Sequence, residues 1–459
     1  MQRPSVQHMT QEAAIPLPTP TEVRAGRGRP FRDLGRPFWY LWTGETIISL
    51  GTQLVQFALG VWIYQRTGSV LDFAGVGLAG LVPQLLVLPI AGNVVDRLDR
   101  RRVIIVSDCA AALMLVAVIV LLWLDELQLV HLYAFVAIMA LARAFKDPAY
   151  RASVGVLLRE DQLTRASGLL GISITTLGIL APTLAGSLMG LIQLPGLVIL
   201  DLITFVAGMS FVWHAFASLP STALADIGRG ALRGVLSESL GNFRRSLVFF
   251  GQSAPIASLF LYSLIQTTLL ALAATMATPL ILANHSPQSL GLTLSCAAAG
   301  ALVGSALMAL FDSPRRRTLV ILTCDAILAC CVTGIGLTDS LLGYCVLEGL
   351  ACCAGSIGTS CAFALWISKA PEAQRGSILA VQGTATAACT AVVLIWGATL
   401  VDLWLEPALA HGWIPTGMSE LLPHMRNGRG IALLFVLSGG LGLITALGGV
   451  AWKPLRNLR

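Results

Sequence analysis

Charge is scarce in this sequence. Only 12% of its 459 residues are Asp, Glu, Lys or Arg, whereas 56% are hydrophobic. A soluble domain carries roughly 25% charged residues. A chain with so little charge cannot cover its surface with groups that water solvates. We therefore expect it to fold in a lipid bilayer, and this expectation excludes the soluble classes of protein.

Three chemical signatures are also missing. The sequence has no GxxxxGK[ST] loop for a nucleotide phosphate and no HExxH pair for a catalytic zinc ion. Its ten cysteines form no CxxC pair and lie inside apolar runs, where cysteine is a small buried hydrophobe. We expect no enzyme activity, no cofactor and no metal site. Export of a soft metal is the alternative, through Cys345, Cys352, Cys353 and Cys361.

Long apolar runs dominate the sequence. About 20 apolar residues cross the hydrocarbon core as a helix, and continuous runs favour helices over the alternating strands of a barrel. The predicted spans fall into two sets of six, separated by a polar stretch. They cover residues 38–64, 72–95, 103–124, 129–150, 162–190 and 194–217, followed by 255–282, 288–311, 318–337, 341–366, 374–401 and 430–452.

The basic residues give the chain an orientation. If the N-terminus is cytoplasmic, 24 of the 30 Lys and Arg residues fall on the cytoplasmic side, three on the outer side and three within the fourth span. Because cytoplasmic loops are enriched in Lys and Arg, we predict a bacterial inner-membrane protein with both termini in the cytoplasm. The net charge of +6 comes from short clusters between spans, so no nucleic-acid partner is expected.

The two sets of spans repeat one another. Each second span ends in an acidic and arginine-rich turn, and each third span carries an early aspartate, Asp108 or Asp325. Repeats of this kind build transporters that rock two bundles against each other. We predict an all-α polytopic membrane protein with 12 transmembrane helices in two pseudo-symmetric six-helix bundles. The predicted domains are a disordered cytoplasmic tail at 1–36, bundles at 37–217 and 255–453, a cytoplasmic linker with an amphipathic helix at 218–254, and a tail at 454–459.

Two longer motifs carry a resemblance to a known family. Residues 92–102 read Gly-Asn-Val-Val-Asp-Arg-Leu-Asp-Arg-Arg-Arg and resemble the signature loop of the major facilitator superfamily, with Asp99 in place of its usual glycine. Residues 178–186 resemble the fifth-span motif of antiporters, with Ala181 in place of the common glycine. Shorter matches at 41–45, 49–51, 67–69 and 143–149 resemble the twelve-span drug:proton antiporter branch, which includes enterobactin exporters and macrolide efflux proteins.

The resemblance implies a conformational gate at the first motif. Charge-assisted hydrogen bonds in the turn would hold one state of the cytoplasmic side, although the arginines can also serve only to anchor the topology. The gate candidates are Gly92, Asp96, Arg97, Arg100, Arg101 and Arg102, with Asp108 as a partner of the arginines. The antiporter-like candidates are Gly178, Pro182 and Gly186, which either permit a bend or simply pack.

Ionisable side chains inside the spans are candidates for function, because a charge in the bilayer is costly. Glu45 lies early in the first span, where loss of water favours its neutral form; it is a candidate proton carrier or an interfacial glutamate. Arg143 and Asp147 are one turn apart and are expected to pair, as a lock or as a protonation switch. Lys146 is expected to reach the membrane interface. Span ten lines the path in this superfamily, so Glu348 is a further coupling candidate.

Uncharged polar residues complete the predicted cavity. The resemblance implies that spans one, four, seven and ten line the path, where the sequence offers Gln53, Gln56, Tyr262 and Gln266 in a mainly apolar wall. Asp201, in span six, is expected to be a packing or interface residue. Such a wall suits a lipophilic or amphipathic solute better than a sugar or nucleotide.

These observations predict a monomeric secondary transporter. It would export a small lipophilic or amphipathic compound, a drug or a secondary metabolite, by proton antiport with alternating access. Its partners would be the bilayer, the substrate and protons. A siderophore exporter of the enterobactin type is the alternative within transport. A sensor that transports nothing and a lipid flippase are the alternatives from other classes.

Overall fold

The computed structural model describes residues 34–95, 98–158, 160–217, 254–310, 316–369, 375–411 and 427–452. Every regular element in these ranges is a helix. The first half of the chain contains α1 (Gly35–Thr67), α2 (Val70–Val95), α3 (Arg100–Trp123), α4 (Leu129–Leu157) and α5 (Glu160–Ala217). The second half contains α7 (Ala254–Leu282), α8 (Pro287–Leu310), α9 (Arg317–Gly336), α10 (Leu341–Lys369), α11 (Arg375–Leu400), a π-helical turn (Val401–Leu405), α12 (Glu406–Ala410) and α14 (Arg429–Ala451).

Helix α5 contains two membrane crossings. Its 58 residues would extend about 87 Å at 1.5 Å per residue, nearly three times the thickness of the hydrocarbon core. The chain leaves the helical conformation at Gln193, where φ is 54° and ψ is −170°. The described residues hold eleven long apolar helices, so the break at Gln193 raises the number of crossings to twelve. The predicted all-helical, twelve-span fold is confirmed, including the separation of the fifth and sixth spans.

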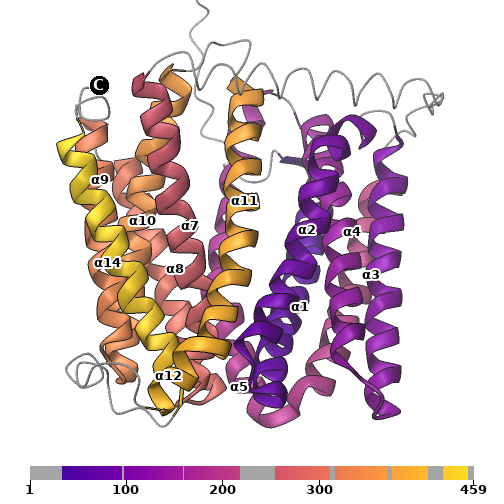
Figure 1. Cartoon of the computed structure of the whole chain (residues 1–459). Helices are drawn as coiled ribbons and strands as arrows, with labels where there is room; N and C mark the ends of the chain where they lie inside the picture. The colour runs from indigo at the N-terminus through magenta and orange to yellow at the C-terminus, as the bar shows by residue number, and fades with distance from the viewer. Residues whose placement is uncertain are drawn as a thin grey trace, which may run out of the picture.

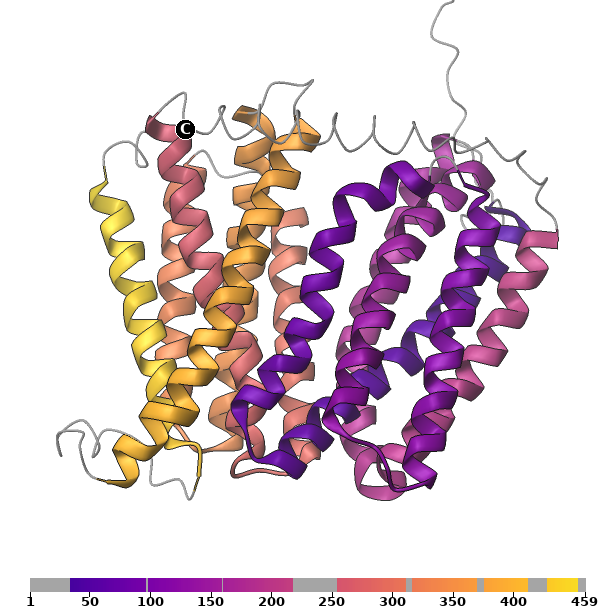
Figure 2. The same cartoon turned by 45° about the vertical axis from the view of Figure 1, so that its right-hand side comes forward.

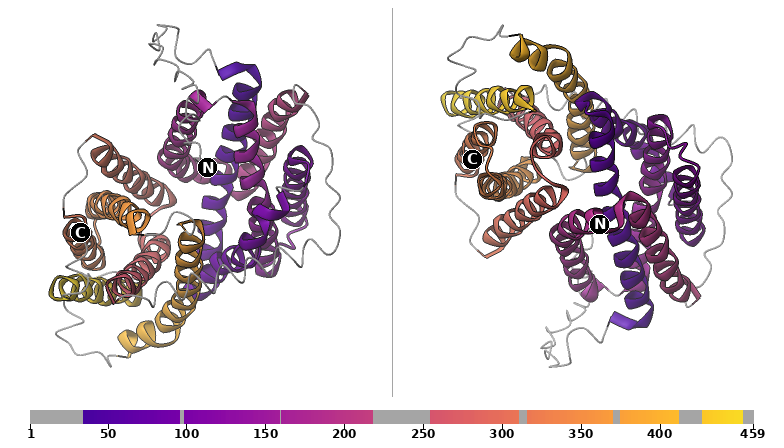
Figure 3. Two further views of the ribbon diagram at one scale, coloured as in Figure 1. Left: turned by 90° about the horizontal axis from the view of Figure 1, so that it is seen from above. Right: turned by 90° about the horizontal axis from the view of Figure 1, so that it is seen from below.

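The two halves lie side by side. Helices α1 to α5 form one group and α7 to α14 the other, as Figures 1 and 2 show from the side and Figure 3 from both ends. Large apolar side chains such as Leu86, Leu191 and Trp396 are exposed on the outer surface, which is expected where lipid surrounds the helices.

Small residues bring helices close together within each half. In the first half, a Cβ added to Gly44 would lie 2.6 Å from the carbonyl oxygen of Gly208, and the reverse distance is the same. In the second half, Gly300 of α8 packs directly on the backbone of Gly349 in α10. Close backbone approach at small residues is a principal means of helix association in membranes.

The contacts between the halves include a polar one at the start of α2. The carboxylate of Asp402 accepts hydrogen bonds from the Ser69 hydroxyl (2.9 Å), the Val70 amide (3.3 Å) and the Leu71 amide (2.8 Å). An acid from the second half therefore satisfies the free amides at the start of a helix in the first half. This contact lies where α1 ends and α2 begins, at the lower end of the molecule in Figure 1.

Several predicted elements lie outside the described residues. They include nearly all of the tail at 1–36, the linker at 218–253 with its amphipathic helix, the C-terminal residues 453–459, and the motif residues Asp96 and Arg97.

Candidate functional site

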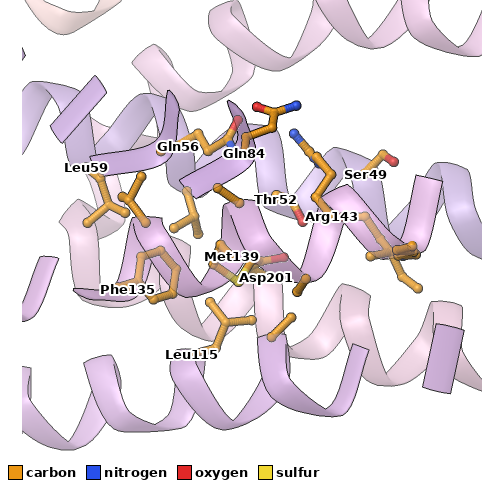
Figure 4. A pocket seen from close by; sticks show the side chains of 18 of the residues that line it. Ser49, Thr52, Gln56, Leu59, Gln84, Leu115, Phe135, Met139, Arg143 and Asp201 are labelled. Atoms are coloured by element: carbon orange, nitrogen blue, oxygen red, sulfur yellow. Dashed lines mark hydrogen bonds between the residues drawn. The ribbon is translucent and has the colours of Figure 1, made fainter. Parts of the chain in front are cut away.

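The main cavity belongs to the first half of the chain. Its volume is about 480 Å³, and α1 to α5 supply all of its lining except Thr275 of α7. Gln56, Gln84 and Arg143 lie along one side of it and Phe135 along the other (Figure 4). Most of the residues that line the cavity are apolar, as the sequence predicted, and six are ionisable.

Three charged side chains meet at this cavity from three helices. The Lys146 ammonium on α4 lies 2.9 Å from Oε2 of Glu45 on α1 and 2.8 Å from Oδ1 of Asp108 on α3. Lys146 and Asp108 are buried, at 8% and 2% exposure. A buried ion cluster persists only where its charges compensate one another. The arrangement is an ionic bridge that ties α1, α3 and α4 together, and we refer to Glu45, Lys146 and Asp108 as the charged triad.

The triad corrects two expectations. Lys146 does not extend to the interface, because two carboxylates lie at its own depth and compensate its charge. Asp108 pairs with Lys146 rather than with the arginines of the turn. The signal was present in the sequence: counted along the predicted spans, all three residues lie about 6–11 Å from the predicted cytoplasmic ends.

Arg143 and Asp147 do not form the predicted pair. Both side chains are exposed on the cavity wall, and no ion pair joins them in the described part of the chain. Exposed pairs one helical turn apart gain very little free energy, so the cavity leaves each side chain solvated. Their predicted role in proton coupling remains a prediction.

The arginine turn holds the first half together. Asp99, which replaces the motif's glycine, accepts a hydrogen bond from the Arg101 amide (3.0 Å) and caps the start of α3. Arg100 donates to the carbonyl of Ala152 on α4 (3.2 Å), and the Arg101 guanidinium lies 5.5 Å from the centroid of the Trp213 ring of α5. Gly92 lies in the last turn of α2.

The Arg102 side chain lies 3.9 Å from Asp99 at the same turn. These contacts stay within the first half. The gating role of the turn remains a prediction.

The antiporter-like motif lies at the boundary between the halves. A Cβ on Gly186 would lie 2.5 Å from the carbonyl oxygen of Pro287, and Gly291 of α8 packs in turn on the Pro182 carbonyl. The hydroxyls of Thr183 and Ser295 share a hydrogen bond of 2.5 Å across the same boundary. Packing between α5 and α8 is thus an observed property of the motif.

Gly178, the motif's first glycine, lies farther from α8, and a Cβ there would be 3.7 Å from that of Ala298. The motif therefore makes its closest approach at its Gly186 end.

The predicted polar lining is only partly correct. Gln56 lines the main cavity, and with Gln53 it lines a smaller one of about 250 Å³ between the halves. Tyr262 and Gln266 line neither cavity. Tyr262 donates to Oδ2 of Asp325 (2.7 Å), and Gln266 donates to the Tyr262 hydroxyl (3.2 Å) and the Gly442 carbonyl (3.1 Å). The reason is that the half-buried Asp325 needs a donor, which Tyr262 supplies, and Gln266 in turn supplies a donor to the Tyr262 hydroxyl.

Two acids differ in their relation to the cavity. Glu348 of α10 lines neither cavity, so its predicted place on the path is not observed. Asp201, expected to be a packing or interface residue, lines the main one (Figure 4). Neither outcome could be inferred from the sequence, because helices that are apolar all round do not show which face is inside.

Within the described residues, no group of three or more His, Cys, Asp or Glu side chains has the geometry of a metal site.

Comparisons with known proteins agree with this geometry. The sequence profile of the Major Facilitator Superfamily matches residues 41–394. Macrolide efflux protein A of Streptococcus pyogenes is 24% identical over 385 residues, which cover 80% of this chain and 89% of that protein. The multidrug efflux pump Tap of Mycolicibacterium fortuitum is 28% identical over 351 residues, which cover 74% of this chain and 83% of the pump.

Solved structures share the fold at lower identity. A bacterial homologue of the iron transporter ferroportin in an inward-facing state has a TM-score of 0.65 at 15% identity, covering 90% of this chain and 98% of that one. The nucleoside transporter NupG has a TM-score of 0.63 at 11% identity, with the same coverage.

Proposed function

The chain belongs to the major facilitator superfamily, and on that premise we propose that it exports small lipophilic or amphipathic compounds in exchange for protons. Its relatives are named for macrolide and multidrug efflux, and a largely apolar cavity suits solutes of this kind. The observation that carries the proposal is the charged triad on the cavity wall, because it offers a proton-accepting group next to the space for a substrate.

The triad gives a physical route from a proton to a movement. With both acids ionised, the Lys146 ammonium holds α1 through Glu45 and α3 through Asp108. A proton on Glu45 removes its negative charge and weakens the link between α1 and α4, while the link between α3 and α4 persists. Glu45 is therefore the proton carrier in this proposal, Asp108 the fixed counter-ion, and Lys146 the group that senses the change.

The contacts between the halves support a structure that is closed on the outer side. Asp402 joins the halves at the end where α1 passes to α2. Thr183 and Ser295 join them about 12–15 Å farther in, counted along their helices. The distribution of Lys and Arg indicates that this end of the molecule faces the outer side of the membrane. In the proposed cycle these contacts break when the transporter opens outward. The protein acts as a monomer in the inner membrane of a bacterial cell, with both termini in the cytoplasm.

The cavity gives less support to a siderophore exporter. Four carboxylates and two cationic side chains line it, so its formal charge is −2 when all are ionised. An anionic siderophore would be repelled by this balance. The residues concerned are Glu45, Asp108, Asp147 and Asp201, with Arg143 and Lys146.

Transport by the purified chain in proteoliposomes tests the proposal. In proteoliposomes that hold the protein in the inside-out orientation, an imposed pH gradient should drive uptake of a macrolide. Glu45→Gln should abolish this uptake, while exchange of the macrolide without a gradient persists. The control is Asp125→Asn, which removes an exposed acid in the loop after α3. If Glu45→Gln responds to the gradient as the wild type does, the coupling assignment is wrong.

A further inference from the structure

Asp201 is a buried acid that the triad does not use. It lies on the second segment of α5, beyond the break at Gln193, and its exposure is 2%. It nevertheless lines the main cavity, where Figure 4 shows it beside Met139. Its Oδ2 has no hydrogen-bond partner. A buried polar atom without a partner is uncommon in a native structure and requires an explanation.

The surroundings do not explain Asp201 as a structural residue. The neighbouring Thr204 hydroxyl donates to the backbone carbonyl of Asp201 (2.9 Å) rather than to its carboxylate. Lys146 is engaged by the triad, and no ion pair within 4.0 Å joins Asp201 to Arg143 in the described part of the chain. An acid kept only for packing would be expected to have donors around it, because an unsatisfied buried carboxylate is costly.

The backbone of α1 makes room for this carboxylate. Gly51 lies so close to it that a side chain there would collide with both Oδ1 of Asp201 and the Thr204 hydroxyl. The glycine therefore lets the acid reach the cavity edge between two closely packed helices. Along α1, Gly51 is six residues beyond Glu45, which corresponds to about 9 Å. Asp201 and the proton-carrying end of the triad are thus separate places on one wall.

The rest of the wall indicates what Asp201 would bind. Leu115, Phe135, Met139 and Phe205 give the cavity an apolar and partly aromatic lining, and aromatic faces attract organic cations. The formal charge of −2 over the whole lining also favours a cation. A ligand with one positive nitrogen on a lipophilic body matches all three features.

We infer that Asp201 is the counter-ion for the ammonium group of lipophilic amine substrates. The inference rests on the proposed export function and deepens it, because it assigns a substrate class and the residue that selects it. The proton and the amine occupy different acids, so exchange between them proceeds through the movement of the helices rather than through competition for one carboxylate.

Binding of two isosteric esters to the full chain in lipid nanodiscs tests the inference. 1-Naphthoylcholine carries a quaternary nitrogen, and 3,3-dimethylbutyl 1-naphthoate has carbon in its place. Loss of one partner of a desolvated charge pair weakens binding by about 30-fold or more. We therefore expect the wild type to prefer the cationic ester by at least that factor, and Asp201→Asn to lose most of that preference.

The controls separate the possible outcomes. Asp125→Asn makes the same chemical change in the exposed loop and should keep the preference. Binding of the neutral ester by Asp201→Asn shows that the variant is folded. If Asp201→Asn keeps the preference for the cationic ester, the inference is overturned. If the wild type binds the neutral ester as tightly as the cationic one, the inference fails and the export function stands. If the wild type in proteoliposomes transports neither ester and no macrolide, the export function itself is contradicted.

A measurement on the unmodified chain covers the case in which Asp201→Asn does not fold. Dicyclohexylcarbodiimide attaches to carboxyl groups in apolar surroundings, and mass spectrometry locates the adduct. The cationic ester should protect Asp201 from labelling, whereas the neutral ester should not. Equal labelling of Asp201 with and without the cationic ester would overturn the inference.

Discussion

The two halves of the molecule bind equivalent aspartates with different partners. Asp108 and Asp325 each lie eight residues after the first residue of their helices, α3 and α9. Asp108 is bound by an ammonium group, that of Lys146, whereas Asp325 is bound by the hydroxyl of Tyr262. The first half therefore holds its aspartate by charge and the second half by a neutral donor.

The difference can be located at one position of the repeat. Helices α4 and α10 both have 29 residues, and the position of α10 that corresponds to Lys146 is Gly358. A Cβ on Gly358 would lie 3.5 Å from Oδ1 of Asp325, so the glycine faces the aspartate as the lysine does in the other half. In the proposed mechanism, the groups that respond to protons therefore lie in the first half, on the wall of the cavity of about 480 Å³.

The largest effect is expected for Lys146→Met. The substitution leaves Glu45 and Asp108 without a counter-ion, and breaking a buried ion cluster costs about 3–5 kcal/mol. Thermal unfolding in detergent, followed with a thiol dye that reports exposure of the ten cysteines, should show a large fall in midpoint. Replacing all three triad residues by neutral ones together should recover much of that loss. If Lys146→Met left the thermal midpoint unchanged, Lys146 would not hold Asp108 by charge, and the contrast between the two halves would not stand.

A paired substitution compares the halves directly. Asp108→Asn leaves Lys146 with a single acid and should lower stability by about 3 kcal/mol. Asp325→Asn keeps an oxygen that can accept from Tyr262, so its cost should be about 1 kcal/mol. The thermal midpoints of the two variants measure the difference. Equal losses would show that the two aspartates are held in the same way.

The polar contact between the halves depends on Asp402. Each of its hydrogen bonds to α2 involves a charged acceptor and is worth about 1.5–3 kcal/mol, so Asp402→Ala should favour the outward-open state. In a cysteine-free background, Thr278→Cys in the smaller cavity should then react faster with a membrane-impermeant maleimide added outside.

Glu406→Ala is the matched control for this contact. Glu406 accepts from the Gly430 amide (3.0 Å) within the second half, so its loss should not expose Thr278→Cys. If both variants react at the wild-type rate, Asp402 does not hold the halves together.

The smallest effect is expected for Arg143→Gln. Arg143 is exposed on the cavity wall and pairs with no acid in the described residues, and exposed charges contribute little to stability. Its thermal midpoint should equal that of the wild type. A loss comparable to that of Lys146→Met would place Arg143 in the ionic bridge.

Apolar runs and charge balance were enough to predict the architecture. A run of about 20 apolar residues crosses lipid as a helix, because a helix satisfies its backbone hydrogen bonds internally. The helix break at Gln193 falls between two predicted spans. Asp99 at the start of α3 was a visible departure from the motif, but its capping role depends on a backbone geometry that the sequence does not state.

Side-chain partners were harder to predict for a physical reason. Depth in the membrane follows from counting residues, and it places Glu45, Asp108 and Lys146 at similar levels. Rotation about the helix axis does not, because helices that are apolar on every side leave the inward face unspecified. For this reason we expected Lys146 to reach the membrane interface, Tyr262 to line the cavity and Asp201 to be a packing or interface residue.

Proton release on substrate binding tests the central claim, that the charged triad couples protons to transport. The purified chain in weakly buffered detergent, with a pH indicator present, should release protons when a macrolide is added, because coupled binding equilibria act in both directions. The account predicts release by the wild type and none by Glu45→Gln, with macrolide binding retained. Equal proton release by both proteins would contradict it.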